Sequence, residues 1–253
     1  MMGLYFSGTG NSRYAVEQFL KACGCDHQAY AIEKEDALAQ LAQHDTLVFA
    51  YPVQYSDVPM IVRQFVSDHA EIWRGKRVFI MATMALFSGD GAGVLARLLM
   101  QHGAEIVGGL HLMMPDSIAD EKALKRSPAR NRRLVEKAEQ KIARAAAQFR
   151  NGKSPRQGMG LFARMAGFFT QRLWFGHQTQ VYHSGLKIDA ERCVGCWKCA
   201  KCCPTGNISM DGNAAKGADR CTLCYRCVNL CPKQAITLLG KKVVEQTSIE
   251  KYH

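Results

Sequence analysis

The sequence predicts an α/β fold, in which a doubly wound parallel sheet is followed by a second, smaller α+β domain. Three observations support this prediction. Short apolar runs alternate with helical patterns over residues 1 to 150, a glycine-containing loop follows the first run, and a cysteine-rich run occurs twice near the C-terminus. At 253 residues the chain is long enough for two domains.

Five apolar runs have the length and composition of strands. They cover residues 2–6, 27–32, 45–50, 77–82 and 105–113. Apolar residues at helical spacing follow the first run from Tyr14 to Ala22 and recur between the later runs, near 36–42, 58–70 and 91–102. Because strands that alternate with helices pair in parallel, we expect a five-stranded parallel sheet with helices on both faces.

The loop after the first strand has the composition of a phosphate-binding loop. Its residues are Ser7, Gly8, Thr9, Gly10, Asn11 and Ser12. Glycines allow close backbone approach, and hydroxyl and amide groups surround the positive N-terminus of the next helix. The loop lacks the Gly-Lys-Ser/Thr of a nucleoside triphosphate site. A dinucleotide fingerprint needs glycine where Arg13 stands, but Glu33 near the end of the second strand leaves that alternative open.

Two further loops should meet the phosphate-binding loop, because ligands of doubly wound sheets bind at the carboxyl ends of the strands. These loops follow the third and fourth strands. Their candidate binding residues are Tyr51, Pro52, Val53, Tyr55, Thr83, Phe87, Ser88, Gly89 and Asp90. Ordinary packing explains each aromatic ring alone, but Tyr51, Tyr55 and Phe87 share one edge of the sheet and together indicate a site for a planar ring.

A cysteine-rich run is duplicated at an offset of 28 residues. Each copy has the spacing C-x2-C-x2-C-x3-C-P, in which three thiolates of one copy and the fourth thiolate of the other hold a [4Fe-4S] cluster. The sequence therefore predicts two [4Fe-4S] clusters. One set of ligands is Cys193, Cys196, Cys199 and Cys231, and the other is Cys203, Cys221, Cys224 and Cys227.

Two alternatives concern these cysteines. Cys202 has the same spacing from Cys199 that a ligand would have, but the repeat offset and Pro204 favour Cys203. Structural zinc also uses pairs of C-x2-C, although it takes four ligands from two such pairs. About fifty-five residues surround the two runs, a length at which an apolar core alone gives marginal stability. We therefore expect the clusters to stabilise this domain.

Charge is distributed unevenly along the chain. The net charge is +11, and residues 1–120 carry −5, residues 121–172 carry +11 and residues 173–253 carry +5. No nucleic-acid motif accompanies the basic segment, so we expect an acidic redox partner protein and no nucleic acid. Eleven cysteines without an N-terminal signal favour the reducing cytoplasm, and no apolar run is long enough for a transmembrane segment.

A long helix is expected after the fifth strand. Ser127 and Pro128 have the residue types of a helix start, and Asn151 and Gly152 those of a helix end. Its apolar stripe consists of Leu134, Ala138, Ile142, Ala145 and Phe149. The other positions are rich in Arg and Lys, which fits either a solvated face or a docking face for an acidic partner.

Domain boundaries follow from these patterns. We expect one domain over residues 1–152, a basic amphipathic linker over 153–185, the cysteine domain over 186–240 and a tail over 241–253. In the linker, apolar residues at helical spacing are Phe162, Met165, Phe169 and Leu173. We expect a helix that packs between the domains, and the alternative is a helix that lies on a membrane surface.

The phosphate-binding loop, Tyr51-Pro52 and the segment from Phe87 to Asp90 resemble flavodoxins, and Cys193 to Pro232 resembles bacterial two-cluster ferredoxins. Together these segments resemble the flavodoxin and ferredoxin fusion proteins of anaerobic bacteria and archaea. The resemblance covers roughly residues 1–150 and 186–240. It implies the strand order 2-1-3-4-5, FMN phosphate in the first loop, and the isoalloxazine ring between the second and third loops. Neither of these two loops contains a tryptophan, unlike those of many short flavodoxins.

The expected function is electron transfer between two [4Fe-4S] clusters, FMN and a redox partner. No acid, base or nucleophile constellation marks a chemical active site. The alternative is an FMN-dependent oxidoreductase that reduces a small molecule or uses NAD(P)H, with the clusters as internal relay. A flavin covered by Tyr55 and Phe87 would favour the carrier, and an open pocket would favour the reductase.

Overall fold

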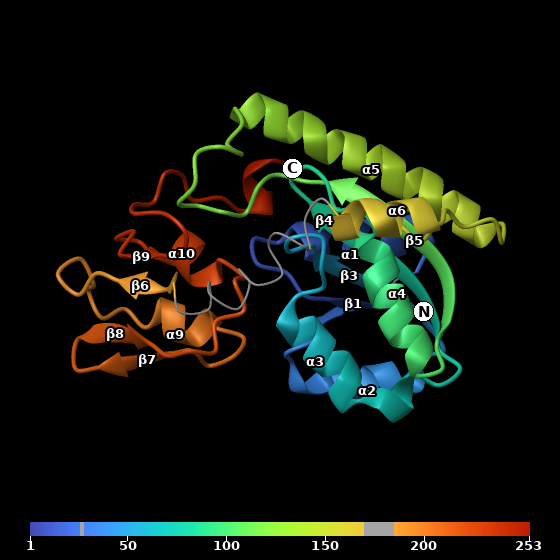
Figure 1. Ribbon diagram of the computed structural model, residues 1–253, viewed down its shortest axis with the longest axis horizontal. Helices are drawn as coiled ribbons and strands as arrows, with labels where there is room; N and C mark the ends of the chain where they lie inside the picture. The colour runs from blue at the N-terminus through green and yellow to red at the C-terminus, as the bar shows by residue number, and fades with distance from the viewer. Residues whose placement is uncertain (26–27, 170–184) are drawn as a thin grey trace.

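The structure is a computed structural model that describes residues 1–25, 28–169 and 185–253. In these residues two modules are joined side by side (Figure 1). The larger one is built on a parallel sheet with the strand order β2-β1-β3-β4-β5. This is the flavodoxin-like order of a doubly wound fold, so the predicted fold class is confirmed.

The sheet module alternates strands and helices in chain order. Its elements are β1 (Met2–Tyr5), α1 (Asn11–Ala22), β2 (Ala29–Ala31), α2 (Glu35–Gln43), β3 (Thr46–Pro52), α3 (Met60–Asp68), η1 (Ala70–Trp73), β4 (Arg77–Met84), α4 (Gly91–Gln101), β5 (Glu105–Met113) and α5 (Pro128–Arg150). The predicted strands and helices agree with these elements apart from their ends.

The sheet is buried on both faces because its central strands alternate between two apolar cores. On β3, Leu47 and Phe49 face a core that α2, α3 and α4 complete, while Val48 and Ala50 face a core that α1 and α5 complete. Side chains of successive strand residues point to opposite faces, so an uninterrupted apolar run is what a strand between two helical layers requires.

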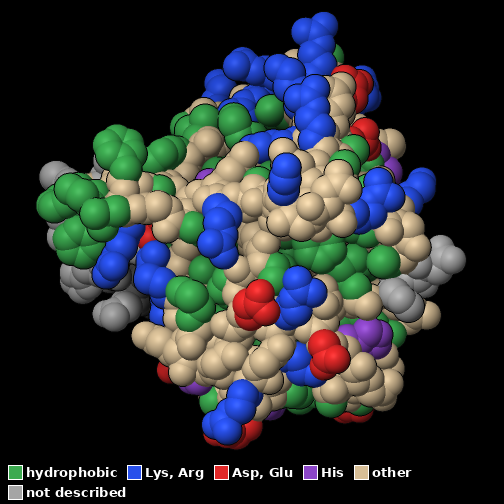
Figure 2. Space-filling view, turned by 90° about the vertical axis from the view of Figure 1, so that its right-hand side faces the viewer, with side chains coloured by type: hydrophobic (Ala, Val, Ile, Leu, Met, Phe, Trp, Pro, Cys, Tyr) green, Lys and Arg blue, Asp and Glu red, His purple; other side chains and the backbone are tan. Residues whose placement is uncertain are grey.

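The long helix α5 begins where the sequence predicts. The Ser127 hydroxyl accepts a hydrogen bond from the Arg130 amide at 3.4 Å, and Pro128 occupies the first helical position. Val135, Ala138 and Ile142 are buried against the sheet. Figure 2 shows basic side chains crowded along the top of the molecule, the edge on which α5 lies.

The predicted linker segment continues along the sheet edge. The Gly109 amide donates to the Pro155 carbonyl at 2.7 Å, and the Gln157 amide donates to the Gly109 carbonyl at 2.9 Å. The helix α6 (Leu161–Gly167) follows, with only Gly167 buried. The exposed fraction of Phe162 is 86%, so the expected packing between the domains is not seen for this side chain. The expectation for Leu173 lies outside the described residues.

No helix among the described residues is long and apolar enough to cross a membrane. The longest, α5, has too many charged side chains for a membrane span.

The small module is built from two short β-pairs and two short helices. Its elements are β6 (Lys187–Ile188), α9 (Lys198–Cys202), β7 (Ile208–Asp211), β8 (Ala214–Gly217), α10 (Arg226–Leu230) and β9 (Ile236–Thr237). β6 pairs with β9 and β7 pairs with β8, both antiparallel. Its core is small and includes Ala119, a residue of the sheet module.

The C-terminal segment returns from the small module to the sheet module. It ends in η4 (Ile249–Lys251), where Ile249 and Tyr252 are buried in the core beneath α1 and α5. The Ile249 amide donates to the Thr9 carbonyl at 2.9 Å. The segment expected as a tail therefore connects the small module to the phosphate-binding loop.

His111 on β5 is largely buried beside the N-terminus of α4. Its Nε2 accepts a hydrogen bond from the Ala92 amide at 3.2 Å, and its Nδ1 lies 3.3 Å from the Ser88 hydroxyl. Burial, with repulsion from Lys141 as the second cause, lowers the pKa of His111 to about 4. The folded protein therefore holds this imidazole in its neutral form.

His111 should make the stability of the protein pH-dependent. Because its folded pKa lies below the unfolded value, the unfolded chain takes up the proton first as the pH falls below about 6.5. We expect this residue to account for a loss of about 2 kcal/mol in the free energy of unfolding between pH 7.5 and pH 5.

Anaerobic denaturant titrations at the two pH values measure the effect. The variant His111→Gln keeps a polar side chain that does not titrate, and its pH-dependent loss should be smaller than that of the wild type by this amount. Equal losses in the two proteins would refute the role of His111.

Candidate cofactor sites at the module interface

The eight predicted ligand cysteines lie around two cavities in the small module. The first, which we call the distal cavity, is lined by Cys193, Cys196, Cys199 and Cys231. The second, the proximal cavity, is lined by Cys203, Cys221, Cys224 and Cys227. Each cavity thus contains three cysteines of one repeat and the fourth cysteine of the other, which is the crossed arrangement of two-cluster ferredoxin motifs.

No group of three or more His, Cys, Asp or Glu in the described residues is placed to hold a single metal ion. The thiols instead surround the two cavities, each with an apolar lining. Ile188, Met210 and Ile236 line the distal cavity, and Leu186, Ile208 and Leu238 line the proximal one. Thiolates that enclose a volume with an apolar wall suit a cluster, which carries its own iron and sulfide between the ligands.

Backbone amides donate hydrogen bonds to several of these sulfurs. The Asn207 amide lies 3.2 Å from Cys203 Sγ, the Ala215 amide 3.4 Å from Cys193 Sγ, and the Ala235 amide 3.3 Å from Cys231 Sγ. Hydrogen bonds to ligand sulfurs stabilise the more negative, reduced level of a cluster and so raise its potential. The two repeats therefore contain both the candidate ligands and backbone amides that would tune them.

Cys202 does not line either cavity. Its thiol lies 3.4 Å from the Cys199 carbonyl, within the helix α9, while Cys203 turns into the proximal cavity. Burial raises the pKa of Cys202 to about 11, so it is a protonated thiol at neutral pH. This placement favours Cys203 as the ligand.

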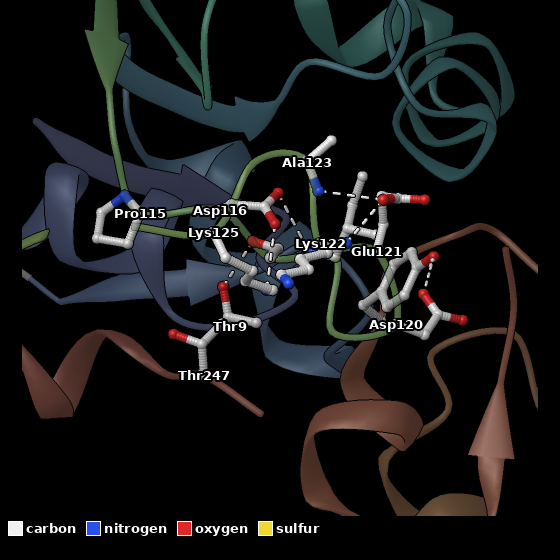
Figure 3. A network of polar contacts seen from close by, with 12 residues as sticks. Thr9, Pro115, Asp116, Asp120, Glu121, Lys122, Ala123, Lys125 and Thr247 are labelled. Atoms are coloured by element: carbon white, nitrogen blue, oxygen red, sulfur yellow. Dashed lines mark hydrogen bonds and ion pairs between the residues drawn. The ribbon is translucent and has the colours of Figure 1, made fainter. Parts of the chain in front are cut away.

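A buried carboxylate of the sheet module holds the small module in place. Asp120, in the loop after β5, accepts hydrogen bonds from the Tyr225 hydroxyl at 2.8 Å and from the amides of Leu238 at 2.6 Å, Leu239 at 3.0 Å and Gly240 at 3.0 Å. Figure 3 shows the Asp120 carboxylate pointing from this loop toward its hydrogen-bonding partner. Burial and the Asp120 carboxylate together raise the pKa of Tyr225, so its hydroxyl remains a donor.

The second cysteine repeat, which begins at Cys221, also contacts the phosphate-binding loop directly. A Cβ atom on Gly8 would lie 2.0 Å from the Cys224 carbonyl oxygen, so only glycine fits at this position. Arg226 Nε donates to the Ser7 carbonyl at 2.8 Å, and the guanidinium pairs with Glu33. Glu33 therefore pairs with the small module through one carboxylate oxygen, and its other oxygen is buried without a hydrogen-bond partner. Arg13 in place of the third glycine remains the argument against the dinucleotide alternative.

A cavity of about 300 Å³ lies where the three sheet loops meet the small module. Its wall includes Gly8 and Asn11 of the first loop, Val53 and Tyr55 of the second, and Phe87 of the third. Pro52 and Thr83 of the predicted binding residues line it as well. The small module forms the remaining wall with Leu223, Cys224 and Tyr225. We call it the interface cavity.

The phosphate-binding loop offers unused hydrogen-bonding groups beside this cavity. The Ser7 hydroxyl, which can donate to an anion, is buried without a partner, as is the Asn11 side-chain oxygen Oδ1, which can only accept. No side chain caps the N-terminus of α1, and Gly10 precedes it with a left-handed φ of 92°. Free amides at an uncapped helix start bind an anion, so these residues fit a phosphate group.

The other side chains of the loop are held by the protein. Asn11 Nδ2 donates to the Pro115 carbonyl at 2.8 Å, the Ser12 and Thr83 hydroxyls lie 2.9 Å apart, and the Thr9 hydroxyl lies 2.7 Å from that of Ser117. Figure 3 shows Thr9 beside the segment that carries Pro115 and Asp116. These contacts fix the shape of the loop around its free amides.

Four predicted binding residues of the second and third loops lie away from the interface cavity. Tyr51 is fully buried in the sheet core, where its hydroxyl donates to the Gly91 carbonyl. Ser88 lies beside His111, Gly89 packs against α6, and Asp90 is buried in an ion pair with Arg97. The structure thus leaves Tyr55 and Phe87 as the aromatic residues of the cavity that the sequence indicated.

Several cavity residues were not predicted. Gln54 lines the cavity and donates to the Thr222 carbonyl at 3.0 Å. The loop after β5 contributes Pro115, Asp116, Ser117, Ile118 and Leu124. The carboxyl end of β5 lies at the same edge of the sheet as those of β3 and β4. The parallel order of the strands therefore allowed the prediction that the loop after β5 also lines the site. The contribution of the small module had no such signal.

Asp116 introduces a carboxyl group into the cavity wall. Burial raises its pKa, and the Lys125 ammonium at 3.2 Å acts in the opposite direction. Both side chains are largely shielded from solvent. Figure 3 shows Asp116 and Lys125 facing one another, so the charge that Asp116 adds to the cavity wall is compensated.

Comparisons with known proteins agree with this division of the chain. Residues 192–235 match the family described as the 4Fe-4S dicluster domain. A comparison with curated proteins finds no match.

Solved structures similar to this chain include flavodoxins. Two-electron reduced flavodoxin from Megasphaera elsdenii is 22% identical, with a TM-score of 0.41, over 57% of this chain and 100% of that one. Oxidised Flavodoxin 2 from Bacillus cereus is 20% identical, with a TM-score of 0.43, over 59% and 97%. A flavodoxin, WrbA-like protein from Agrobacterium tumefaciens is 21% identical, with a TM-score of 0.39, over 60% and 98%.

Because these sequence identities and TM-scores are low, the assignment of the fold rests on the observed strand order. The chain joins a flavodoxin-like sheet module to a segment that matches a 4Fe-4S dicluster domain.

The two neighbouring cysteines provide a test of the ligand assignment. Cys203→Ser should remove the proximal cluster and lower the iron and sulfide content by about half, because four thiolates are needed for each cluster. Cys202→Ser should keep the wild-type content. Anaerobic iron and sulfide analysis of both variants measures this, and the reverse pattern would assign Cys202 as the ligand.

Proposed function

We propose that this protein is an iron–sulfur flavoprotein that transfers single electrons between two [4Fe-4S] clusters, FMN and a redox partner. The observation that carries the proposal is the shared wall between two sites. Cys224 and Tyr225 line both the proximal cavity and the interface cavity, so a wall shared by two neighbouring residues separates a cluster site from a flavin-sized site.

FMN, when bound, would supply a centre that accepts electrons one or two at a time. The residues of the interface cavity would hold it. The free amides at the start of α1 and the Ser7 hydroxyl bind phosphate. Val53, Tyr55 and Phe87 provide an apolar and aromatic site for a planar ring.

The small module has two roles in this proposal. Its cysteines bind the clusters, and Leu223 to Tyr225 close one side of the interface cavity and exclude water there. Electron transfer needs no acid, base or nucleophile, because no bond is made or broken. It needs a short and fixed distance between the proximal cluster site and the flavin site. The hydrogen bonds of Asp120 and the ion pair of Arg226 fix this distance, because they hold the small module against the sheet module.

Cofactor analysis of the anaerobically purified protein tests the proposal. We expect about eight irons and about one FMN per chain, since each cluster contains four irons. Reduced ferredoxin should bleach the flavin band. Zinc in place of iron, or the absence of flavin, would refute the cofactor assignment.

A phosphate-loop variant tests the FMN site separately from the clusters. Asn11→Asp introduces a negative charge at the N-terminus of α1 and should weaken FMN binding at least tenfold, or about 1.4 kcal/mol. The affinity for riboflavin, which has no phosphate, should change less than twofold, and the iron content should not change. Equal losses for FMN and riboflavin, measured by fluorescence titration, would place the phosphate elsewhere.

One observation favours a second candidate function, an FMN-dependent reductase. Leu86 and Phe87 line the interface cavity but are 56% and 51% exposed, so this side is not sealed. A small molecule or a nicotinamide could reach a bound flavin there. Bleaching of the flavin by NADPH or NADH in the absence of ferredoxin would support this candidate.

A further inference from the structure

The two cysteine repeats present equivalent faces in different environments. The residue after the second cysteine is Trp197 in the first repeat and Tyr225 in the second. Both have a left-handed backbone, with φ of 62° and 63°, and both precede a short helix, α9 or α10. The next residue is basic in both repeats, Lys198 or Arg226. The duplication therefore preserves an aromatic and a basic side chain beside each cluster site.

In the second repeat this pair is buried against the sheet module. Tyr225 is 4% exposed and donates to the Asp120 carboxylate at 2.8 Å. Arg226 forms an ion pair with Glu33. The aromatic donor and the cation thus bind two carboxylates of the module with which the proximal site exchanges electrons.

In the first repeat the same pair is exposed. Trp197 is 52% exposed, and Val194, the equivalent of the buried Thr222, is 57% exposed. Cys196 is the exposed thiol of the distal cavity. We call the surface formed by Val194, Cys196, Trp197, Lys198, Lys201 and Lys233 the distal face.

The distal face is basic around an apolar centre. The lining of the distal cavity includes Lys198 and Lys233 but no carboxylate. Within the described parts of the chain, no ion pair or hydrogen bond engages the ammonium of either lysine or of Lys201. The indole N–H of Trp197 is a donor only, so this face offers donors and cations to a partner with acceptors and anions.

We propose that the distal face docks an acidic protein electron carrier, whose carboxylates surround its own redox centre. Trp197 and Lys198 would bind carboxylates of the carrier. Within the chain, their equivalents Tyr225 and Arg226 bind the carboxylates of Asp120 and Glu33 in the same way. The inference rests on the proposed electron-transfer function and adds the place where electrons enter or leave.

The electron balance of an encounter is simple. One electron leaves the reduced carrier, which is oxidised by one electron, and the distal cluster site gains it. The exposed Cys196 side of the distal cavity is the contact point, and the proximal cavity lies toward the sheet module. No proton transfer and no covalent step is required, so a brief electrostatic encounter is sufficient.

A second copy of this chain is a poorer occupant. The carboxylates that accept the pair within the chain, Asp120 and Glu33, are already bound by Tyr225 and Arg226. The strongly basic helix α5 lies over the sheet module, away from α9 and the distal face (Figure 1). A carrier that docked on α5 would therefore lie away from α9 (Figure 1).

Stopped-flow reduction of the cluster-loaded protein by a pre-reduced acidic ferredoxin tests the inference. The double variant Lys198→Glu/Lys233→Glu should lower the second-order rate constant at least tenfold at low ionic strength and should remove its decrease with added salt. The control Arg132→Glu/Arg133→Glu, on exposed positions of α5, makes the same change in net charge and should stay within twofold of the wild type.

The opposite pattern, or equal effects of the two variants, would overturn the inference. Iron content and reduction by methyl viologen radical show that the variant clusters are intact. If Lys198→Glu/Lys233→Glu loses iron, the neutral variant Lys198→Gln/Lys233→Gln is used in its place. A rate constant of this neutral variant within twofold of the wild type would contradict docking at the distal face. A concentration-dependent dimer that the same lysine variants dissociate, observed by sedimentation, would assign the face to a second copy instead.

Cluster bleaching reports the docking step, and flavin bleaching reports the onward step. Fast cluster reduction without flavin reduction would therefore contradict the proposed function and leave the distal face as the docking site.

Discussion

The structure depends on the buried carboxylate of Asp120. It accepts one hydroxyl and three amide hydrogen bonds from the small module, although it belongs to a loop of the sheet module. Charge-assisted hydrogen bonds of this kind are stronger than neutral ones, and removal of a buried partner leaves several donors unsatisfied. The loop after β5 therefore fixes the position of the small module, and with it the position of the proximal cavity.

The small module would be a weak folding unit without this support. Its buried core contains few apolar residues, one of which, Ala119, comes from the sheet module. The other contributions are the contact of Gly8 with Cys224 and the ion pair of Arg226 with Glu33. In a module of this size the ligands of a metal cofactor contribute directly to folding. Stability and function thus depend on the same cysteines.

The sheet module could be predicted from the sequence because its signals are local. Uninterrupted apolar runs such as 47–51 identify strands between two helical layers, and Ser127 with Pro128 identifies the start of α5. The duplicated cysteines likewise predicted which thiols the structure brings together. Their spacing encodes crossed pairing without any knowledge of the fold.

The walls of the interface cavity could not be predicted in the same way. Tyr51 follows the right strand, but the alternation of β3 turns it into the core, while the neighbouring Pro52 lines the cavity. Leu223 to Tyr225 reach the cavity only because distant loops are brought together by Asp120 and Arg226. Such contacts depend on tertiary docking, which leaves no periodicity in the sequence.

The most direct test of this account is the rate of electron transfer from the clusters to the flavin in Asp120→Asn. An amide in place of the carboxylate loses the negative charge and keeps one acceptor oxygen, so its N–H group faces either the three backbone amides or the Tyr225 hydroxyl, which must then accept. At unchanged iron and FMN content, the account predicts a rate at least tenfold lower than in the wild type. Asp211→Asn, which alters an exposed ion pair of the small module, should have the wild-type rate. A wild-type rate in Asp120→Asn would contradict the claim that this carboxylate sets the distance between the cofactors.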